Sequence, residues 1–522
     1  MAGKISLTLK YDENLEDVLS KRYPDWVDYR VLSKSLDARG ANRGKKPKYH
    51  FNVHYIKKGE RFDSFQEEFV DLGSFKSPPI IIGAGPAGLF CALRLAEYGV
   101  PSLIFERGEP AHNRMKKIAR FWRYGEFDSE NNVCYGEGGA GLFSDGKLIT
   151  RIKSPFVSYV MNRFVSFGAP KETAYISNPH LGSNKIRNLI SKMTEYLKEK
   201  KCQIHYNSKV KKILTTSDHK VEGVELEDGR TFFSPHVVLA TGHSPQEMYQ
   251  HLSKLGVSMA PKDFAVGVRI EHPRKLIDHI QLGHFAEDKK LGSARYRLSY
   301  HDTETNKGTY SFCMCPGGYV LSSGTEADGI VVNGMSNFAR NSKWSNSALV
   351  VSVKANSDFS TENNILAGLD FQRDIEKKAC LYSKEMATGK ELPAQTLKDF
   401  LGNNENPKFL PKTSSPSGLF PFALDKILPP FVTSHLRNSF IEFEKSLEGF
   451  CFEDSLLIAP ETRTSSPLTI SREKETLESI SHQGLYPCGE GAGHAGGITS
   501  AAVDGVKVAM AMIKKEKGYV PN

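Results

Sequence analysis

The N-terminal part of the chain alternates apolar and polar residues over short stretches. The sequence ISLTLKY, for example, places apolar side chains at every second position, as half-buried strands do. A helical pattern with acidic residues in its first turn lies between two such stretches. The predicted elements are strands at residues 5–11, 28–36 and 48–56 and a helix at residues 12–23. Together they predict a small α+β module over residues 1–60 and a linker over residues 61–77.

From Pro79 the pattern changes to short apolar runs, glycine turns and longer helical stretches. Residues 80–96, IIIGAGPAGLFCALRLA, have the pattern of a buried strand, a turn and a helix. Further strands are predicted at residues 202–214, 221–229 and 236–242. Strands and helices in this order are typical of an α/β protein with a parallel sheet.

After about residue 262 the alternation of helix and strand fades. Segments such as FAVGVRIEH, GGYVLSSG and GIVVNGMS predict strands without helices between them. Residues 485–510, LYPCGEGAGHAGGITSAAVDGVKVAM, return to a strand, a glycine loop and a helix. The predicted fold is therefore α/β, with a discontinuous Rossmann-like domain formed by residues 78–262 and 475–522. A mixed, largely antiparallel β substrate domain, residues 263–474, is inserted between the two parts.

Composition adds an expected compartment to this picture. The chain has 522 residues and eight cysteines, whose spacings match neither a disulfide framework nor a zinc-binding pair, so we expect a reducing environment and no metal site. No N-terminal leader and no apolar run of membrane-spanning length is evident, and cytoplasm is the expected location. The net charge is +9, and residues 1–60 hold 13 Lys and Arg against 8 Asp and Glu. The basic excess is thus concentrated in the N-terminal module.

The first glycine loop has the pattern of a dinucleotide-binding turn. Gly83, Gly85 and Gly88 form GxGxxG between a β-branched strand and a helix, and Glu106 follows at the end of the next predicted strand. Glycines let the backbone approach a pyrophosphate at the helix N-terminus, and the acid can accept hydrogen bonds from a ribose. The predicted cofactor-binding residues here are Gly83, Gly85, Pro86, Ala87, Gly88, Glu106 and Arg107.

Two later segments favour FAD over NAD. The strand HVVLATG resembles the one that closes the flavin nucleotide domain in the glutathione-reductase superfamily. In that superfamily a late strand ends in Gly-Asp, and the resemblance implies that Glu490 here replaces the acid that bonds the ribityl chain, with the next helix facing the flavin. The residues predicted from these segments are Val210, Ala240, Thr241, Gly242, Gly489, Glu490, Gly497, Ile498 and Thr499. A second strand-GxGxxG-helix unit is absent from the sequence, so NAD(P)H is expected only as a transient donor.

Several motifs together resemble one family. They are FWRYGEFDSENNVCYGEGGAGLFSDGKLITRIK, NPHLGSNKIR, FAVGVRIEHP, SFCMCPGGYV, VNGMSNFARNSKWSNSALVVSV, ETRTSSP and YPCGEGAGHAGGITSAAVDG. They are similar to the uncharacterised FAD-dependent dehydrogenases, a group of the glutathione-reductase-like FAD-binding superfamily, over nearly the whole chain. The resemblance implies an oxidoreductase that uses non-covalently bound FAD in hydride transfer to or from an unidentified small-molecule substrate. His494 departs from the family pattern, in which we expect an aromatic residue such as Tyr.

The loop at residues 136–147, GEGGAGLFSDGK, follows the second predicted strand, where related flavoenzymes pass a loop beside the flavin ring. Disulfide-reducing relatives carry a cysteine pair there, and this loop has none. Glutathione-reductase-type disulfide chemistry at this loop is therefore not predicted. The loop residues predicted to contact the cofactor are Gly139, Ser144, Gly146 and Lys147.

The candidate catalytic residues are Cys313, Cys315 and His494. The two cysteines are two positions apart, so an extended strand would project both thiols to one face, although free cysteine also serves as a small buried hydrophobe. A histidine in the late glycine loop suits proton transfer, and it also suits a purely structural hydrogen bond. The alternatives are His180 and His272 as acids or bases, and Arg269 and Arg340 as either anion-binding groups or ion-pair partners.

The basic N-terminal module offers two rival functions. The loop ARGANRGKKPK carries Arg39, Arg43, Lys45, Lys46 and Lys48. The first rival is an RNA-directed flavoprotein, since basic loops beside aromatic strands bind nucleic acid. The second is a docking surface for a protein electron donor, which would suit a chain without its own NADH domain. The sequence leaves the oligomeric state open.

Overall fold

The computed structural model describes residues 3–62, 69–360, 362 and 364–520. The described residues form a mixed α/β structure with six separate sheets. The predicted linker falls partly outside the described residues, because residues 63–68 are not among them. None of the helices in the described ranges combines the length and the apolar character that crossing a lipid bilayer requires.

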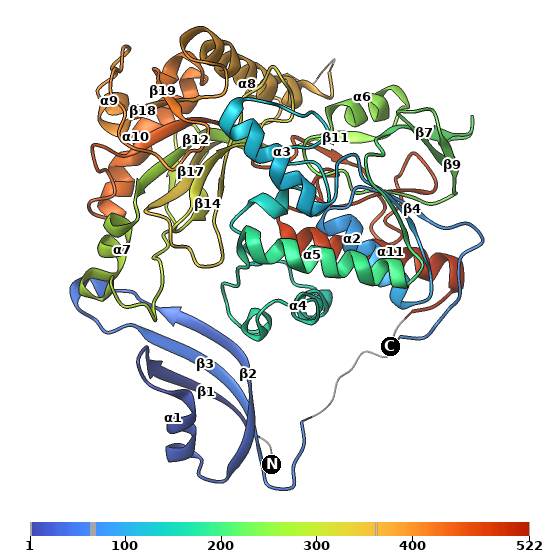
Figure 1. The fold of residues 1–522 in the computed structure, drawn as a ribbon, viewed down its shortest axis with the longest axis horizontal. Coiled ribbons are helices and arrows are strands. Elements are labelled where there is room, and N and C mark those ends of the chain that lie inside the picture. The colour runs from blue at the N-terminus through green and yellow to red at the C-terminus, as the bar shows by residue number, and fades with distance from the viewer. Residues whose placement is uncertain (1–2, 63–68, 361, 363, 521–522) are drawn as a thin grey trace.

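The N-terminal module is a three-stranded antiparallel sheet with one helix, and it extends from the rest of the molecule in Figure 1. Its elements are β1 (Gly3–Lys10), α1 (Leu15–Arg22), β2 (Trp26–Asp37) and β3 (Lys48–Lys57), paired in the order β1-β3-β2. Leu7, Leu19 and Val53 form part of its buried core. Asn14 caps α1 by accepting a hydrogen bond from the backbone N–H of Glu16 at 2.8 Å. These elements lie where the alternating pattern predicts them.

Hydrogen bonds at two places join this module to the rest of the chain, near Tyr11 and Tyr49 and at Lys34. The Tyr11 hydroxyl donates to Asp288 at 2.8 Å, and the backbone N–H of Lys34 donates to the Tyr175 carbonyl at 3.0 Å. In the basic loop, Arg39 pairs with Asp37 and Lys46 pairs with Asp12. Part of the loop's positive charge is therefore balanced within the module.

A five-stranded parallel sheet brings the two ends of the main body together. Its strands, in spatial order, are β22 (Leu485–Pro487), β10 (Val237–Leu239), β4 (Ile80–Ile82), β5 (Leu103–Phe105) and β6 (Gln203–His205). The strand predicted over residues 202–214 is in fact two strands in different sheets. Asn207 adopts a positive φ of 50° between them, and this turn separates β6 from β7.

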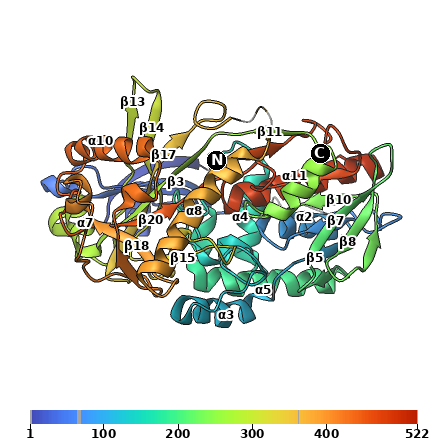
Figure 2. The same cartoon turned by 90° about the horizontal axis from the view of Figure 1, so that it is seen from above.

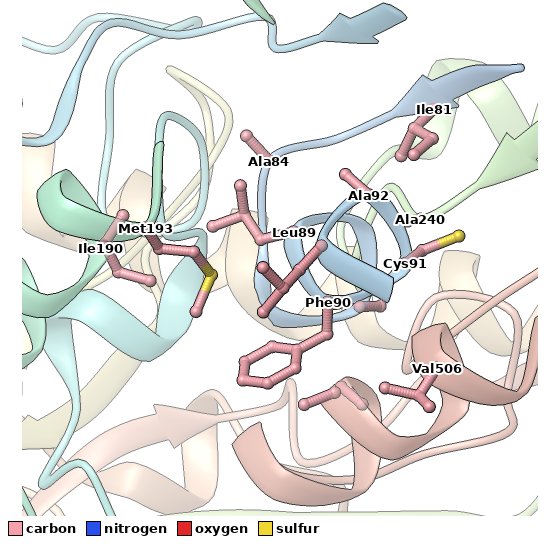
Figure 3. Packing of buried hydrophobic residues seen from close by; sticks show 14 of the residues in the cluster. Ile81, Ala84, Leu89, Phe90, Cys91, Ala92, Ile190, Met193, Ala240 and Val506 are labelled. Carbon is pink, nitrogen blue, oxygen red and sulfur yellow. The ribbon is translucent and has the colours of Figure 1, made fainter. Parts of the chain in front are cut away.

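Helices pack against the parallel sheet and against each other. They are α2 (Pro86–Glu97), α3 (Ala111–Tyr124), α4 (Phe156–Ser166), α5 (Gly182–Glu199) and α11 (Ile498–Lys517). Figure 3 shows α2 between α5, which carries Ile190 and Met193, and α11, which carries Val506. The helices α2 and α11 approach closely at Gly505, where an added Cβ would lie 2.0 Å from the Ala87 carbonyl oxygen. The helix that follows β4 and the helix that follows β22 are therefore packed as one unit, although they come from opposite ends of the main body's sequence.

Two smaller elements flank the parallel sheet. One is an antiparallel meander formed by β7 (Val210–Thr215), β8 (Val221–Leu226) and β9 (Thr231–Phe233), and it lies near α6 (Gln246–Lys254). The other is the antiparallel pair of β11 (Met259–Pro261) and β21 (Leu468–Ile470). The second pair connects the segments that enter and leave the central part of the chain.

The central part of the chain forms a seven-stranded sheet that lies beside the parallel-sheet half in both Figure 1 and Figure 2. Its order is β13 (Ser299–Asp302), β14 (Lys307–Cys315), β17 (Trp344–Val353), β12 (Phe264–Pro273), β20 (Leu456–Glu461), β18 (Leu392–Thr396) and β19 (Leu419–Pro421). Only the β18 and β19 pair is parallel. The remaining elements are β15 (Tyr319–Ser322), β16 (Val332–Met335), α7 (Arg274–Leu282), α8 (Ala367–Met386), α9 (Leu397–Leu401) and α10 (Pro430–Ser446).

Candidate functional site

A cavity of about 660 Å³ lies between the carboxyl ends of the parallel strands and the seven-stranded sheet. In open parallel sheets, ligands bind at this edge. Most of the predicted cofactor-binding residues line the cavity: Gly83, Gly85, Pro86, Ala87, Glu106, Arg107, Gly139, Ser144, Gly146, Lys147, Val210, Ala240, Thr241, Gly242, Glu490, Gly497 and Ile498. Gly88, Gly489 and Thr499 lie outside its lining. Of the predicted catalytic residues, only Cys313 is part of the lining.

The first glycine loop is shaped by close backbone contacts. A Cβ at Gly83, whose φ is +105°, would lie 2.4 Å from the Ala240 carbonyl oxygen, and one at Gly88 would lie 2.0 Å from the Gly83 oxygen. Gly88 therefore serves the packing of helix against turn, which explains its place behind the cavity wall. At Gly85 an added Cβ would meet only the Gly139 Cα, at 3.9 Å, so this glycine leaves open space on the cavity side.

Two helices begin at the cavity without a described side chain capping their first turn. α2 begins at Pro86 after Gly85, and α11 begins at Ile498 after Gly497. Backbone N–H groups in the first turn of a helix lack intrahelical partners and carry partial positive charge. The cavity therefore has two places that favour an anionic or electron-rich ligand group. One is at an early helix in the sequence and the other is at the last helix.

Glu106 has a larger structural role than the sequence indicates. Its buried carboxylate accepts backbone hydrogen bonds from Ala84 at 2.9 Å, Gly108 at 3.0 Å and Gly136 at 2.9 Å. It thus holds three loops at the cavity wall. A carboxylate has about four acceptor positions, so one position on Oε2 is left for a ligand hydroxyl. The neighbouring Arg107 is paired with Glu130, which balances its charge.

The late glycine loop places Glu490 in the cavity lining and His494 outside it. The backbone N–H of Gly489 donates to Asp504 at 2.8 Å, and Asp504 is held by Arg472, so the loop is anchored behind the cavity. His494 Nε2 lies 3.0 Å from the Ile470 carbonyl oxygen, and burial lowers the pKa of its imidazole. The structure therefore gives His494 the structural hydrogen bond that the sequence offered as the alternative to catalysis.

Glu490 is the ionisable group in the lining whose pKa is most informative. Desolvation raises the pKa of its carboxyl to about 7, and nearby Lys262 only partly opposes this rise. Within the described residues no hydrogen bond reaches this carboxylate. Glu490 can therefore gain or lose a proton near neutral pH inside the cavity.

A Glu490→Gln variant is expected to change the pH dependence of stability. Because the folded pKa of about 7 lies above the ordinary 4.5, ionisation costs the wild type stability as pH rises from 4.5, and the cost is complete above 7. The variant should therefore have the higher free energy of unfolding above pH 7, by up to about 3 kcal/mol. Urea unfolding without added ligand measures this difference. The control is Glu227→Gln, which changes an exposed carboxylate in the same way. If the free energy of unfolding of Glu490→Gln differs from that of wild type by the same amount above pH 7 and near pH 4.5, the expectation is contradicted.

Cys313 reaches the cavity because β14 is irregular. The β14–β17 register shifts between Phe312 and Cys315, and Cys313 has a φ of +45°. The backbone here is therefore not the extended strand that would project both thiols to one face. Cys313 lines the cavity, whereas Cys315 is fully buried behind it. A bulge of this kind redirects a side chain next to a binding site.

The alternative site residues take part in internal contacts. Arg269 forms a bidentate pair with Glu461, with distances of 2.9 and 2.8 Å, and Arg340 pairs with Asp145. His180 Nε2 lies 3.1 Å from the Phe338 oxygen and His272 Nε2 lies 2.9 Å from the Phe450 oxygen. Burial lowers the pKa of both imidazoles to about 4. The pairing of Arg269 with Glu461 and of Arg340 with Asp145 supports the ion-pair interpretation of both arginines over the anion-binding one.

Several cavity residues were missed by the sequence analysis. They are Cys134, Tyr135, His243, Phe312, Asn333, Glu461, Arg463 and Thr464. The motif ETRTSSP contained a usable signal, because Glu461, Arg463 and Thr464 all lie within it. Cys134 and Tyr135 directly precede the predicted loop at residues 136–147, His243 follows Gly242, and Phe312 precedes Cys313, so these residues adjoin positions that were predicted.

Two sequence comparisons identify relatives of this chain. Residues 263–464 match a family described as "FAD-dependent protein, C-terminal domain-like". An "uncharacterized protein" of Clostridium beijerinckii is 40% identical over 534 residues, and the match covers 98% of each chain. The chain therefore belongs to the family of that clostridial protein, and its central part matches the FAD-dependent family model.

The solved structures are more distant. A triple mutant of the flavin-dependent brominase Bmp2 has a TM-score of 0.37 and 12% identity, and the match covers 85% of this chain and 81% of that one. CtdE in complex with FAD has a TM-score of 0.31 and 11% identity, with 84% of both chains covered. At these TM-scores the likenesses carry no argument about the reaction of this chain.

Proposed function

We propose that this protein is an oxidoreductase that binds FAD non-covalently in the cavity and transfers a hydride to or from a small-molecule substrate. The observation that carries the proposal is the pair of uncapped helix starts at Pro86 and Ile498. The two starts are far apart in the sequence, but both line the same cavity. The match of residues 263–464 to an FAD-dependent family supports the proposal. The cavity also matches the size of common ligand sites.

The residues present fit FAD. Gly85 leaves open space where a side chain would face the cavity, and the α2 N–H groups beside it suit a pyrophosphate. The remaining acceptor position of Glu106 suits a ribose hydroxyl, Glu490 suits the ribityl chain, and the α11 start suits the pyrimidine edge of the flavin. When bound, FAD supplies two-electron hydride chemistry.

The side chains around the flavin end would control water and protons. Phe312 and Ile498 contribute apolar surface to this part of the lining, which would limit the access of water. Glu490, with a carboxyl pKa of about 7, can hold a proton at the carboxyl group or release it to a substrate atom. We therefore propose Glu490, rather than His494, as the acid or base of the reaction.

The electron donor is proposed to be NAD(P)H that enters the cavity transiently. Docking of a protein donor on the N-terminal module and RNA binding by its basic loop stay predictions. Of the five basic residues of that loop, Arg39 and Lys46 already have acidic partners. This pairing weakens the loop's attraction for phosphate but leaves both alternatives to direct binding assays.

A Glu106→Gln variant tests the cofactor proposal. The amide replaces one acceptor oxygen by a donor that would face a backbone N–H, so the wall loops lose a hydrogen bond worth about 1–3 kcal/mol. FAD affinity is expected to fall roughly tenfold or more. Flavin absorbance and FAD titration of the purified chain measure it, with Glu227→Gln as the control. A wild-type chain that neither carries flavin after gentle isolation nor takes up FAD would overturn the proposal.

A further inference from the structure

Cys313 and Cys315 form a close pair that the proposed hydride chemistry does not use. Cys313 lines the cavity, and Cys315, with none of its surface exposed, lies directly behind it. The Cys315 thiol donates to the Cys313 carbonyl oxygen at 3.4 Å, so it points back toward Cys313. One thiol therefore lines the cavity, and the other is buried beside the same turn of backbone.

The bulge that creates this arrangement is held by two cations. Arg269 donates to the Cys313 carbonyl at 3.3 Å, and the Lys147 ammonium donates to the Met314 carbonyl. Cys313 has a positive φ, a conformation that a residue with a Cβ rarely adopts unless its surroundings impose it. Strain of this kind concentrates at functional sites, and here its effect is to turn one thiol into the cavity.

The same neighbours make the two sulfurs chemically unlike. The neighbouring Cys315 thiol, with the positive charges of Lys147 and Arg269, lowers the pKa of the Cys313 thiol below its ordinary value. The hydrogen bond with Cys313 and burial raise the pKa of the Cys315 thiol. The charged groups that act on the pair are Lys147, Arg269, Asp145, Glu461 and Glu490. A thiolate in front of a protonated thiol is the arrangement of an attacking and a resolving cysteine.

We propose that Cys313 and Cys315 form a redox-active dithiol that alternates with an internal disulfide and passes two electrons to an acceptor in the cavity. The acceptor is a two-electron oxidant, either a small disulfide or the flavin of the proposed function. With a small disulfide, the Cys313 thiolate attacks one sulfur and releases one thiolate, and a mixed disulfide forms. Cys315 then loses its proton, attacks the Cys313 sulfur and releases the second thiolate. One S–S bond is broken and one is formed, and the two electrons lost by the cysteines appear in the two released thiols.

Alkylation of the purified full-length protein tests the reactivity of Cys313. Cys134 lines the same cavity, but burial raises the pKa of its thiol, so it is an internal control of equal access. With limiting iodoacetamide near neutral pH, peptide mass spectrometry should find Cys313 modified at least about tenfold faster than Cys134. Equal rates would overturn the assignment of Cys313 as the attacking thiolate.

Exchange with oxidised glutathione tests the couple and does not depend on flavin. Wild type should form a Cys313–Cys315 disulfide and release two thiols. A Cys315→Ser variant should stop at one glutathione bound to Cys313, and Cys315→Ala, which differs in shape, guards against a folding defect. If wild type also stops at the mixed disulfide, or never reacts, the dithiol proposal fails while the FAD proposal stands.

The second arm identifies the acceptor and rests on the proposed function. FAD-loaded wild type, reduced at the cysteines and kept anaerobic, should lose flavin absorbance and gain the Cys313–Cys315 disulfide in equal amounts, whereas Cys315→Ser should do neither. Disulfide formation with glutathione but none with flavin would assign a small disulfide as the acceptor. A chain without flavin would fail only this arm.

Discussion

A Gly505→Val variant is expected to lose at least about 3 kcal/mol of its free energy of unfolding, together with FAD binding. The added Cβ alone would lie 2.0 Å from the Ala87 carbonyl oxygen and 3.0 Å from the Cys91 amide nitrogen. These are backbone atoms of α2, so no side-chain rotation relieves the overlap, and α2 and α11 must separate. Each helix begins at the cavity. When the helices separate, their two uncapped starts can no longer contact the same bound FAD.

The exposed position Lys507 supplies the control for this substitution. Lys507→Val places the same β-branched residue in the same helix, where it costs well under 1 kcal/mol of helix propensity and buries nothing. Urea unfolding and FAD titration of both variants measure the difference. If the two variants unfold at the same urea concentration, the close packing of α2 on α11 does not stabilise the fold as argued.

The sequence predicted the parts of this site that depend on local geometry. Glycine spacing around Gly83 and an apolar strand before it define a turn by backbone sterics alone, and Glu106 follows from strand length. The second glycine loop near Glu490 was instead predicted from the resemblance to the glutathione-reductase superfamily. The contact of Gly505 with Ala87 was beyond both, because more than four hundred residues separate the two positions and only their packing shows why a glycine is needed.

The predictions that changed depend on long-range partners or on backbone irregularities. The sequence leaves Arg269 and Arg340 open between anion binding and ion pairing, and only the positions of Glu461 and Asp145 beside them favour ion pairing. His494 has a loop position suited to proton transfer, but its ring faces the Ile470 carbonyl. The strand period predicted equivalent thiols in β14, and a single bulge makes them unlike. Charge pairing and bulges of this kind leave no mark in residue spacing.

Replacing Arg269 by methionine is expected to cost about 3–5 kcal/mol. The guanidinium is fully buried and also donates to Asn346 at 2.9 Å, so its removal leaves the Glu461 carboxylate buried without its cation. In the variant the pKa of Glu461 should rise, because its carboxylate has lost its cation. The loss of unfolding free energy should therefore be largest at pH values above this raised pKa and smaller as the pH falls below it. Urea unfolding across pH measures this. Arg437→Met removes a similar bidentate pair at the surface and should cost under about 1 kcal/mol.

The double variant Arg269→Met with Glu461→Leu separates the structural role of Arg269 from its electrostatic role. Replacing both charges by apolar groups removes the unpaired carboxylate, so most of the lost stability should return. The cation that acts on Cys313 is still missing, so alkylation of Cys313 should remain slower than in wild type. Recovery of both properties would mean that Arg269 affects Cys313 only by holding the fold. Recovery of stability without recovery of alkylation would show that the buried ion pair is not needed for folding. The role of Arg269 would then be to lower the pKa of the Cys313 thiol.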